Sequence, residues 1–271
     1  MKNISNNKLN IRRCPPSPRV LCRNYSEAKA INNQLNPWFV TGFSDGEGSF
    51  GIRITQNKTY LIGWRVQPCF EIGLHQKDIS LLREIQLFFG VGQIYVYGSM
   101  AYYKVTSIKD LAVIIYHFDK YSLITQKRAD YLLFKFIVEL CTQKEHLTRD
   151  GLHKIVSIRA TMNKGLSNEL KAGFSNVIPV PRPIFAEQQI KDPNWLAGFV
   201  SGEGCFMIKV IKSSSNFVGC QVKLVFQITQ HSRDTQLMKS LVEYWGCGRY
   251  VVRPNGLAGD FVVTFLISQI K

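Results

Sequence analysis

The chain repeats itself, and this repeat constrains the fold more than any other feature of the sequence. The phrase GFSDGEGSF at 42–50 returns 156 residues later, at 198–206, as GFVSGEGCF. The same offset gives eight identical residues in the 27 positions from 66 to 92, without an insertion. The chain therefore contains two copies of one structural unit, which we expect to be related by a pseudo-twofold axis.

The hydrophobic pattern predicts the same order of elements in both copies. A short helix comes first, with a tryptophan near its start and Gly-Glu-Gly at its end. Two strands of alternating apolar and polar residues follow. Next comes a helix behind Asp78 or Asp234, which we expect to be N-cap residues. A hairpin ending in strands at 101–107 and 260–266 completes each copy. Only the first copy continues, into helices at about 109–118, 125–141 and 147–164.

This order predicts an α+β protein in four segments. Residues 1–35 form a basic leader without regular structure, and 36–173 form the first unit. A linker with three prolines spans 174–192, and the second unit spans 193–271. The second unit lacks the equivalent of the last helices of the first. We therefore expect it to be incomplete at its C-terminal end, with one side of its sheet uncovered. Either the second unit is abbreviated, or the chain is a fragment of a longer protein.

The charge predicts a polyanionic partner. The chain carries 34 Lys and Arg against 19 Asp and Glu, a net charge of +15. The first 35 residues hold +6 of it, so 15 − 6 leaves +9 on the rest. Nucleic acid is the leading partner and an anionic membrane surface the second. No apolar run is long enough to span a membrane. The leader is basic and contains serine, as in a mitochondrial transit segment, although a disordered leader or the tail of an upstream reading frame would have the same composition.

The doubled Gly-Glu-Gly is the candidate site. Each motif carries two glycines four residues apart, a spacing that lets two helices pack closely. If these helices pack along the pseudo-twofold axis, Glu47 and Glu203 lie side by side. Adjacent carboxylates repel unless a cation lies between them, and hard oxygen ligands suit Mg²⁺. The carbonyls of Gly46 and Gly202 are natural further ligands for it. Such a metal can activate a water and stabilise the leaving oxygen of a phosphodiester. The alternative is two exposed acids at helix ends.

The motifs resemble a known family. Residues 40–48, VTGFSDGEG, and 196–204, LAGFVSGEG, are similar to the two motifs of single-chain LAGLIDADG homing endonucleases. The phrases FQITQH at 226–231, LITQK at 123–127 and MNKG at 162–165 extend the likeness to the group encoded in fungal mitochondrial introns. The resemblance implies two αββαββα units whose motif helices form the central interface. It also implies that their antiparallel sheets form a saddle over DNA.

The resemblance further implies a metal-dependent, site-specific DNA endonuclease. The penultimate acid of each motif, Glu47 or Glu203, would bind a divalent metal and serve to cut one DNA strand across the minor groove. The product would be a double-strand break with short 3′ overhangs. Lys127, in the loop before a helix, would lie near the cut phosphate. Gln230 would line the same pocket, a role that its counterpart Leu74 cannot fill.

One position differs between the two motifs. Two residues before the penultimate acid, the first motif has an acid, Asp45, whereas the second has Ser201. In the family this position is a helix-end partner rather than a metal ligand. We therefore expect the difference to have only a local effect on stability.

The strand alternation also gives each sheet an open face of polar and long side chains. Arg, Lys and Gln on such a ribbon can reach base edges in the major groove, and Lys on phosphates makes binding salt-dependent. We expect DNA contacts from the residues that share this face. They are Ser49, Arg53, Thr55, Asn57, Arg65, Gln67, Glu71, Gln93, Tyr95, Tyr102 and Lys104 in the first copy, and Lys209, Gln221, Lys223, Gln227, Arg249 and Arg253 in the second. The alternative is a solvated sheet face.

Two other functions stay open at this point. The chain could be a maturase that helps its host intron RNA to fold without cutting DNA, or an inactive DNA-binding remnant. Both acids are intact, which argues against simple decay. We expect a monomer that acts in the mitochondrion on double-stranded DNA. The target site and the host intron are not readable from the residues.

Overall fold

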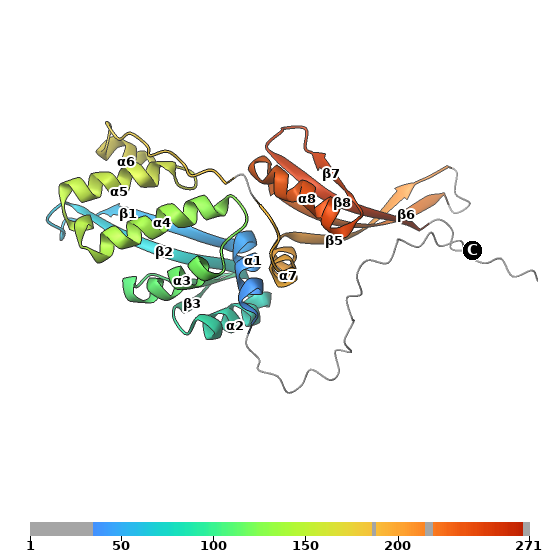
Figure 1. Ribbon diagram of the computed structural model, residues 1–271, viewed down its shortest axis with the longest axis horizontal. Coiled ribbons are helices and arrows are strands. Elements are labelled where there is room, and N and C mark those ends of the chain that lie inside the picture. The colour runs from blue at the N-terminus through green and yellow to red at the C-terminus, as the bar shows by residue number, and fades with distance from the viewer. Residues whose placement is uncertain (1–34, 186–187, 215–218, 268–271) are drawn as a thin grey trace, which may run out of the picture. The chain divides into compact units, whose positions relative to one another are not determined.

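A computed structural model describes residues 35–185, 188–214 and 219–267 (Figure 1). Nearly all of the predicted leader lies outside the described residues. The first copy comprises α1 (Pro37–Glu47), β1 (Gly48–Gln56), β2 (Trp64–His75), a 3-10 turn η1 (Gln76–Asp78), α2 (Ile79–Phe89), β3 (Gln93–Tyr97), β4 (Met100–Val105), α3 (Ile108–Lys120), α4 (Lys127–Thr142), η2 (Glu145–Leu147), α5 (Arg149–Thr161) and α6 (Asn168–Gly173). The second copy comprises α7 (Pro193–Glu203), β5 (Gly204–Lys212), β6 (Cys220–His231), η3 (Ser232–Asp234), α8 (Thr235–Trp245), β7 (Arg249–Val252) and β8 (Ala258–Ile267).

Each copy builds a four-stranded antiparallel sheet, in the orders β1-β2-β4-β3 and β5-β6-β8-β7. The α+β prediction, the repeat of the element order and the three extra helices of the first copy are thereby confirmed. The short helix α6 was not predicted. Among the described helices, none has the length and apolar character that a membrane crossing requires.

The apolar face of the first sheet is buried under helices. Phe50, Ile52 and Ile54 alternate along β1, and each is at most 5% exposed. The ring of Phe50 lies 5.3 Å from that of Tyr131 and 5.5 Å from that of Phe134, both on α4. The helices that follow β4 thus complete the core of this copy.

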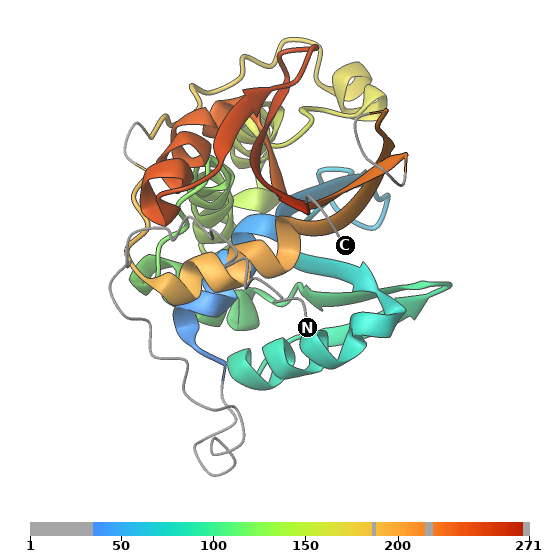
Figure 2. The same ribbon diagram turned by 90° about the vertical axis from the view of Figure 1, so that its right-hand side faces the viewer.

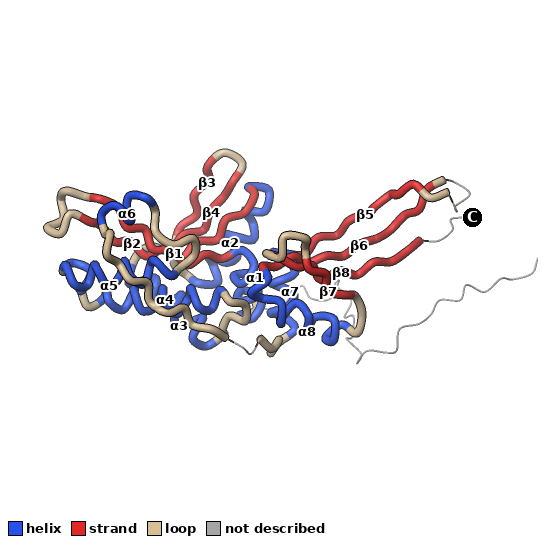
Figure 3. The backbone as a smooth tube through the Cα atoms, turned by 90° about the horizontal axis from the view of Figure 1, so that it is seen from above, coloured by secondary structure: helices blue, strands red, loops and turns tan. Residues whose placement is uncertain are grey.

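The apolar face of the second sheet is open. Phe206, Ile208 and Val210 occupy the repeat positions on β5, yet they are 80%, 73% and 66% exposed. Within the described residues, no helix follows β8 as α4 and α5 follow β4. Figure 3 shows β5, β6 and β8 without a helix along their outer part, whereas helices run along the first sheet. The predicted uncovered face is therefore present among the described residues.

The motif helices α1 and α7 pack against each other, as Figure 2 shows for the blue and orange helices. Proline starts each helix, where it costs no hydrogen bond. A Cβ placed on Gly42 would overlap the carbonyl oxygen of Trp195, and one on Gly198 would overlap that of Phe39. Only glycine allows the two backbones to come this close. The predicted close approach of the two helices is confirmed.

Asp78 and Asp234 hold the predicted N-cap positions of α2 and α8, but their side chains make no cap hydrogen bond. His75 and His231 instead accept a hydrogen bond at Nδ1 from the amide two residues further on, which caps the 3-10 turn. The helix starts are therefore shaped by the histidines, and the carboxylate of Asp234 is left for another partner.

Candidate active site

Glu47 and Glu203 end the motif helices and lie next to each other. A Cβ on Gly46 would be 3.2 Å from Cγ of Glu203, and a Cβ on Gly202 would be 3.1 Å from Cγ of Glu47. Each acid thus packs over the glycine that precedes the other acid. The glycines before the acids are what makes room for the two carboxylates at one end of the interface.

The two carboxylates are harder to ionise than free carboxylates. Burial raises the pKa of both, and Glu47 raises the pKa of Glu203 further. Among the described residues no group of three or more His, Cys, Asp and Glu side chains could hold a metal. The donors at this point are therefore two carboxylates and main-chain carbonyls. An all-oxygen set of this kind suits a hard divalent cation that keeps several waters.

Lys127 reaches into the same place from the first unit. It is the first residue of α4, and its Nζ donates to the carbonyl of Ser44 at 3.0 Å and to that of Gly46 at 2.8 Å. Burial lowers its pKa, while Asp45, Glu203 and Glu47 oppose this shift. The lysine thus places a positive charge at the C-terminal end of α1, where the helix dipole favours it.

Gln230 is placed beside the second acid. It lies on β6, and its side chain hydrogen-bonds to the carboxylate of Glu203, which lowers the pKa of that group. The counterpart on β2 is Leu74, which has no group for such a bond. The structure thus brings all four candidate catalytic residues to the ends of α1 and α7.

Asp45 holds more of the site together than its place in the motif indicated. It is 2% exposed, and its carboxylate accepts hydrogen bonds from the amides of Ile124 and Thr125 and from the hydroxyl of Thr125 at 2.6 Å. It also accepts from Nε1 of Trp195 on α7 at 2.8 Å. Burial raises its pKa to about 6. Ser201, by contrast, is exposed and donates only to the carbonyl of Ala197 in its own helix.

The predicted DNA-facing residues of the first sheet share one face. The strand register aligns Ser49 with Glu71, Glu71 with Lys104 and Lys104 with Gln93. Further pairs are Arg53 with Gln67, Thr55 with Arg65, and Tyr95 with Tyr102. Asn57 lies in the turn after β1, where its side chain accepts from Thr59. Lys104 and Glu71 form an ion pair of 2.6 Å.

A groove of about 630 Å³ runs along this face. Its second wall, from α5 and the loop after it, includes Arg159, Asn163 and Lys164. Arg159 donates to the carbonyls of Ile52 and Gly165, which ties the loop to β1. The sequence analysis missed these residues as site residues, although the MNKG phrase marked their loop.

The predicted residues of the second sheet also share a face. Lys209 pairs with Lys223. Gln227 and Arg249 both pair with Val262 of β8, from its two sides, and so lie in one row across the sheet. Gln221 pairs with Ile211 near the far end of β5 and β6. Arg253 is engaged within the protein, because its guanidinium binds Asp260 at 2.9 Å.

The profile of the LAGLIDADG endonuclease family matches residues 40–138 and 196–271. The chain belongs to this family. It is 42% identical over 220 residues to "Probable intron-encoded endonuclease 3" of Neurospora crassa, a match of 80% of this chain and 41% of the relative. It is 41% identical over 244 residues to "Probable intron-encoded endonuclease 2" of the same fungus, a match of 85% of this chain and 52% of the relative. The chain therefore spans about half the length of these curated relatives, or less.

Solved LAGLIDADG structures match both copies. I-SmaMI bound to uncleaved DNA target in the presence of calcium ions superposes with a TM-score of 0.83 and 49% identity, over 86% of this chain and 80% of that chain. I-GzeII in complex with its DNA target gives 0.79 and 44%, over 85% and 79%. The two-sheet architecture is thus that of LAGLIDADG homing endonucleases.

Proposed function

We propose that the chain is a site-specific endonuclease that makes double-strand breaks in DNA with a divalent cation held by Glu47 and Glu203. The observation that carries this proposal is the pair of adjacent, half-buried carboxylates, one from each copy. Burial is the main cause of their raised pKa values, and the charge of Glu47 adds to the rise at Glu203. A bound cation would stabilise the ionised form of both groups. Calcium in a DNA complex of I-SmaMI supports a divalent cation site in the family.

Mg²⁺ is the cation we propose, with the carbonyls of Gly46 and Gly202 as further ligands. When bound, it would activate a water and stabilise the leaving oxygen of the phosphodiester. Lys127 would place its ammonium group near the cut phosphate, where it opposes the charge that develops on the oxygens. Gln230 would hold the carboxylate of Glu203 in one orientation.

Double-stranded DNA is the proposed partner, and the polar sheet faces are its proposed binding surface. Structures of I-SmaMI bound to cleaved DNA and of I-GzeII with its target support this choice. Arg53, Gln67 and Lys104 border the groove on the first sheet, where they would meet base edges and phosphates. One chain supplies both acids, so we propose that it acts as a monomer.

The proposed origin is a mitochondrial intron. Relatives include proteins named for an ND4 intron of Podospora anserina and a cox1 intron of Schizosaccharomyces pombe. Both are genes of the respiratory chain that mitochondria encode. The DNA target would therefore lie in a mitochondrial gene.

Cleavage of a randomised DNA library with the full chain and Mg²⁺ tests the proposal. We expect one long site to be enriched, cut on both strands with short 3′ overhangs, and EDTA to abolish the cutting. Cutting without sequence preference, or no cutting at any metal concentration, would contradict it. Binding of intron RNA with rescue of splicing, in the absence of cutting, would favour a maturase instead.

A further inference from the structure

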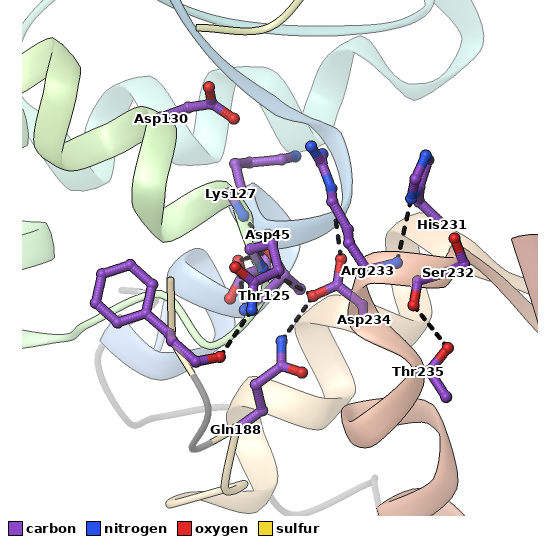
Figure 4. Close-up of polar contacts among 12 residues, drawn as sticks. Asp45, Thr125, Lys127, Asp130, Gln188, His231, Ser232, Arg233, Asp234 and Thr235 are labelled. Atoms are coloured by element: carbon purple, nitrogen blue, oxygen red, sulfur yellow. Dashed lines mark hydrogen bonds and ion pairs between the residues drawn. The ribbon is translucent and has the colours of Figure 1, made fainter. Parts of the chain in front are cut away.

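The carboxylate of Asp234 belongs to the second unit but is used by the first. Asp234 ends η3, ahead of α8, and is 2% exposed. Its Oδ1 accepts from the amide of Gln126 at 2.7 Å and from Nε2 of Gln188 at 2.6 Å (Figure 4). Its Oδ2 lies 3.9 Å from Nε of Arg233. Gln126 is in the first unit and Gln188 in the linker, so one carboxylate joins three parts of the chain.

Gln126 is the residue directly before Lys127. It has the N-cap position of α4, and its own side chain makes no cap hydrogen bond. The carboxylate of Asp234 instead accepts from the amide of the N-cap residue itself, one of the donors at a helix start that find no partner within the helix. A negative charge at a helix N-terminus is also favoured by the helix dipole.

Two carboxylates thus hold the turn before Lys127 in place through hydrogen bonds to its backbone amides. Asp45 binds the amides of Ile124 and Thr125, and Asp234 binds the next amide along the chain. Gln188 supports the same turn, because its Nε2 also donates to the carbonyl of Ile124 at 3.1 Å. Figure 4 shows Lys127 and Thr125 close to the Asp45 side chain, with Asp234 and Gln188 next to them.

The first copy contains the counterpart of Asp234, which allows a direct comparison. Asp78 occupies the same position in the first copy, but it is exposed, and its side chain does not cap α2. The two aspartates therefore share sequence context and local fold and differ in what lies across from them. The burial of Asp234 comes from the first unit and the linker, not from its own helix.

We infer that Asp234 is a positioning residue, through which docking of the second unit sets the place of Lys127 beside Glu47 and Glu203. The inference rests on the proposed function, because the role of Lys127 in cleavage is part of it. In consequence, the first unit would present its lysine correctly only when the second unit is packed against it.

The test compares Asp234→Ala with Asp78→Ala in the full chain. We expect Asp234→Ala to slow single-turnover cleavage by about 10-fold to 100-fold, with the Kd for DNA within about threefold of wild type. Asp78→Ala should leave the rate unchanged. Asp234→Asn keeps an acceptor oxygen and should recover much of the rate, which also covers the case in which the alanine variant does not fold.

A double-mutant cycle separates positioning from general loss of stability. If Asp234 acts through Lys127, then Asp234→Ala should have little further effect on the rate in a Lys127→Ala background. Equal slowing in both backgrounds would overturn the inference, as would an unchanged rate in the single variant. If Lys127→Ala itself cuts at the wild-type rate, the proposed function of the lysine fails instead.

A measurement that does not depend on DNA cleavage distinguishes failure of this inference from failure of the proposed function. Acylation of Lys127 by an amine-reactive reagent, followed by mass spectrometry, reports how well the ammonium group is held. We expect Asp234→Ala to raise the acylation rate several-fold and Asp78→Ala to leave it unchanged. Equal rates in both variants and wild type would overturn the inference, whatever the activity of the protein on DNA.

Discussion

At the scale of single residues, Asp45 contributes to stability through hydrogen bonds that join its motif to other parts of the chain. Its carboxylate receives hydrogen bonds from the loop before α4 and from Trp195 of the other copy. Burial nevertheless raises its pKa, so the ionised form is costly in the folded state. Asp45, which is not one of the two candidate catalytic acids, therefore connects the two copies next to the site.

This cost predicts a pH dependence of stability. The pKa of Asp45 rises from 3.8 to about 6 on folding, so its protonation favours the folded state. Its contribution is fully present below about pH 4 and is lost as the pH rises through about 6. This rise in the pKa of Asp45 corresponds to about 3 kcal/mol in the free energy of unfolding.

Urea unfolding at several pH values measures this contribution. Between pH 4 and pH 7, wild type should lose about 3 kcal/mol more in the free energy of unfolding than Asp45→Asn, which cannot ionise. Parallel curves for the two proteins would show that the carboxylate of Asp45 is ionised at low pH in the folded state.

Sequence patterns indicated the candidate catalytic residues, but not the contacts that hold them in place. Glu47 and Glu203 followed from the doubled motif, because two copies at one offset imply a shared axis. The bonds of Asp234 to Gln126 and Gln188 could not be predicted, since they join segments far apart in the chain. Local patterns describe only an acid before a helix, so they predicted the N-cap positions of Asp78 and Asp234 but not the partners of their side chains.

At the scale of elements, the same alternation gives two different sheet faces. Period-two patterning predicted which residues share a face in both copies, and the strand registers agree with it. What covers a face depends on other elements. Phe50 is buried under α4, whereas Phe206 is 80% exposed, although its ring centroid lies 4.8 Å from that of Phe226.

Truncation of these two phenylalanines should therefore differ in cost. Phe50→Ala should lower the free energy of unfolding by about 3–5 kcal/mol, because it leaves a cavity in a packed core. Phe206→Ala should lower it by about 1 kcal/mol or less, because the side chain is already in water. Denaturant unfolding of both variants gives the comparison. Equal losses would mean that the second face is covered in solution.

At the scale of the whole molecule, the repeat, the charge and the site all support the proposed endonuclease activity. The first copy brings Glu47 and Lys127, the second brings Glu203 and Gln230, and α1 and α7 place them together. Two acids on a pseudo-twofold axis match the two antiparallel strands of a DNA duplex. The net charge of +15 favours approach to that duplex. The proposed double-strand cleavage therefore requires both copies.

The most direct measurement is plasmid cleavage at the selected target by Glu47→Gln and Glu203→Gln, with Mg²⁺ present. The exposed Glu84 on α2 supplies the control variant, Glu84→Gln. We predict that each active-site variant binds the target like wild type but makes double-strand breaks at least about 100-fold more slowly, since several kcal/mol of charge stabilisation are lost. The control should cut normally. Full cutting by both active-site variants would contradict the account.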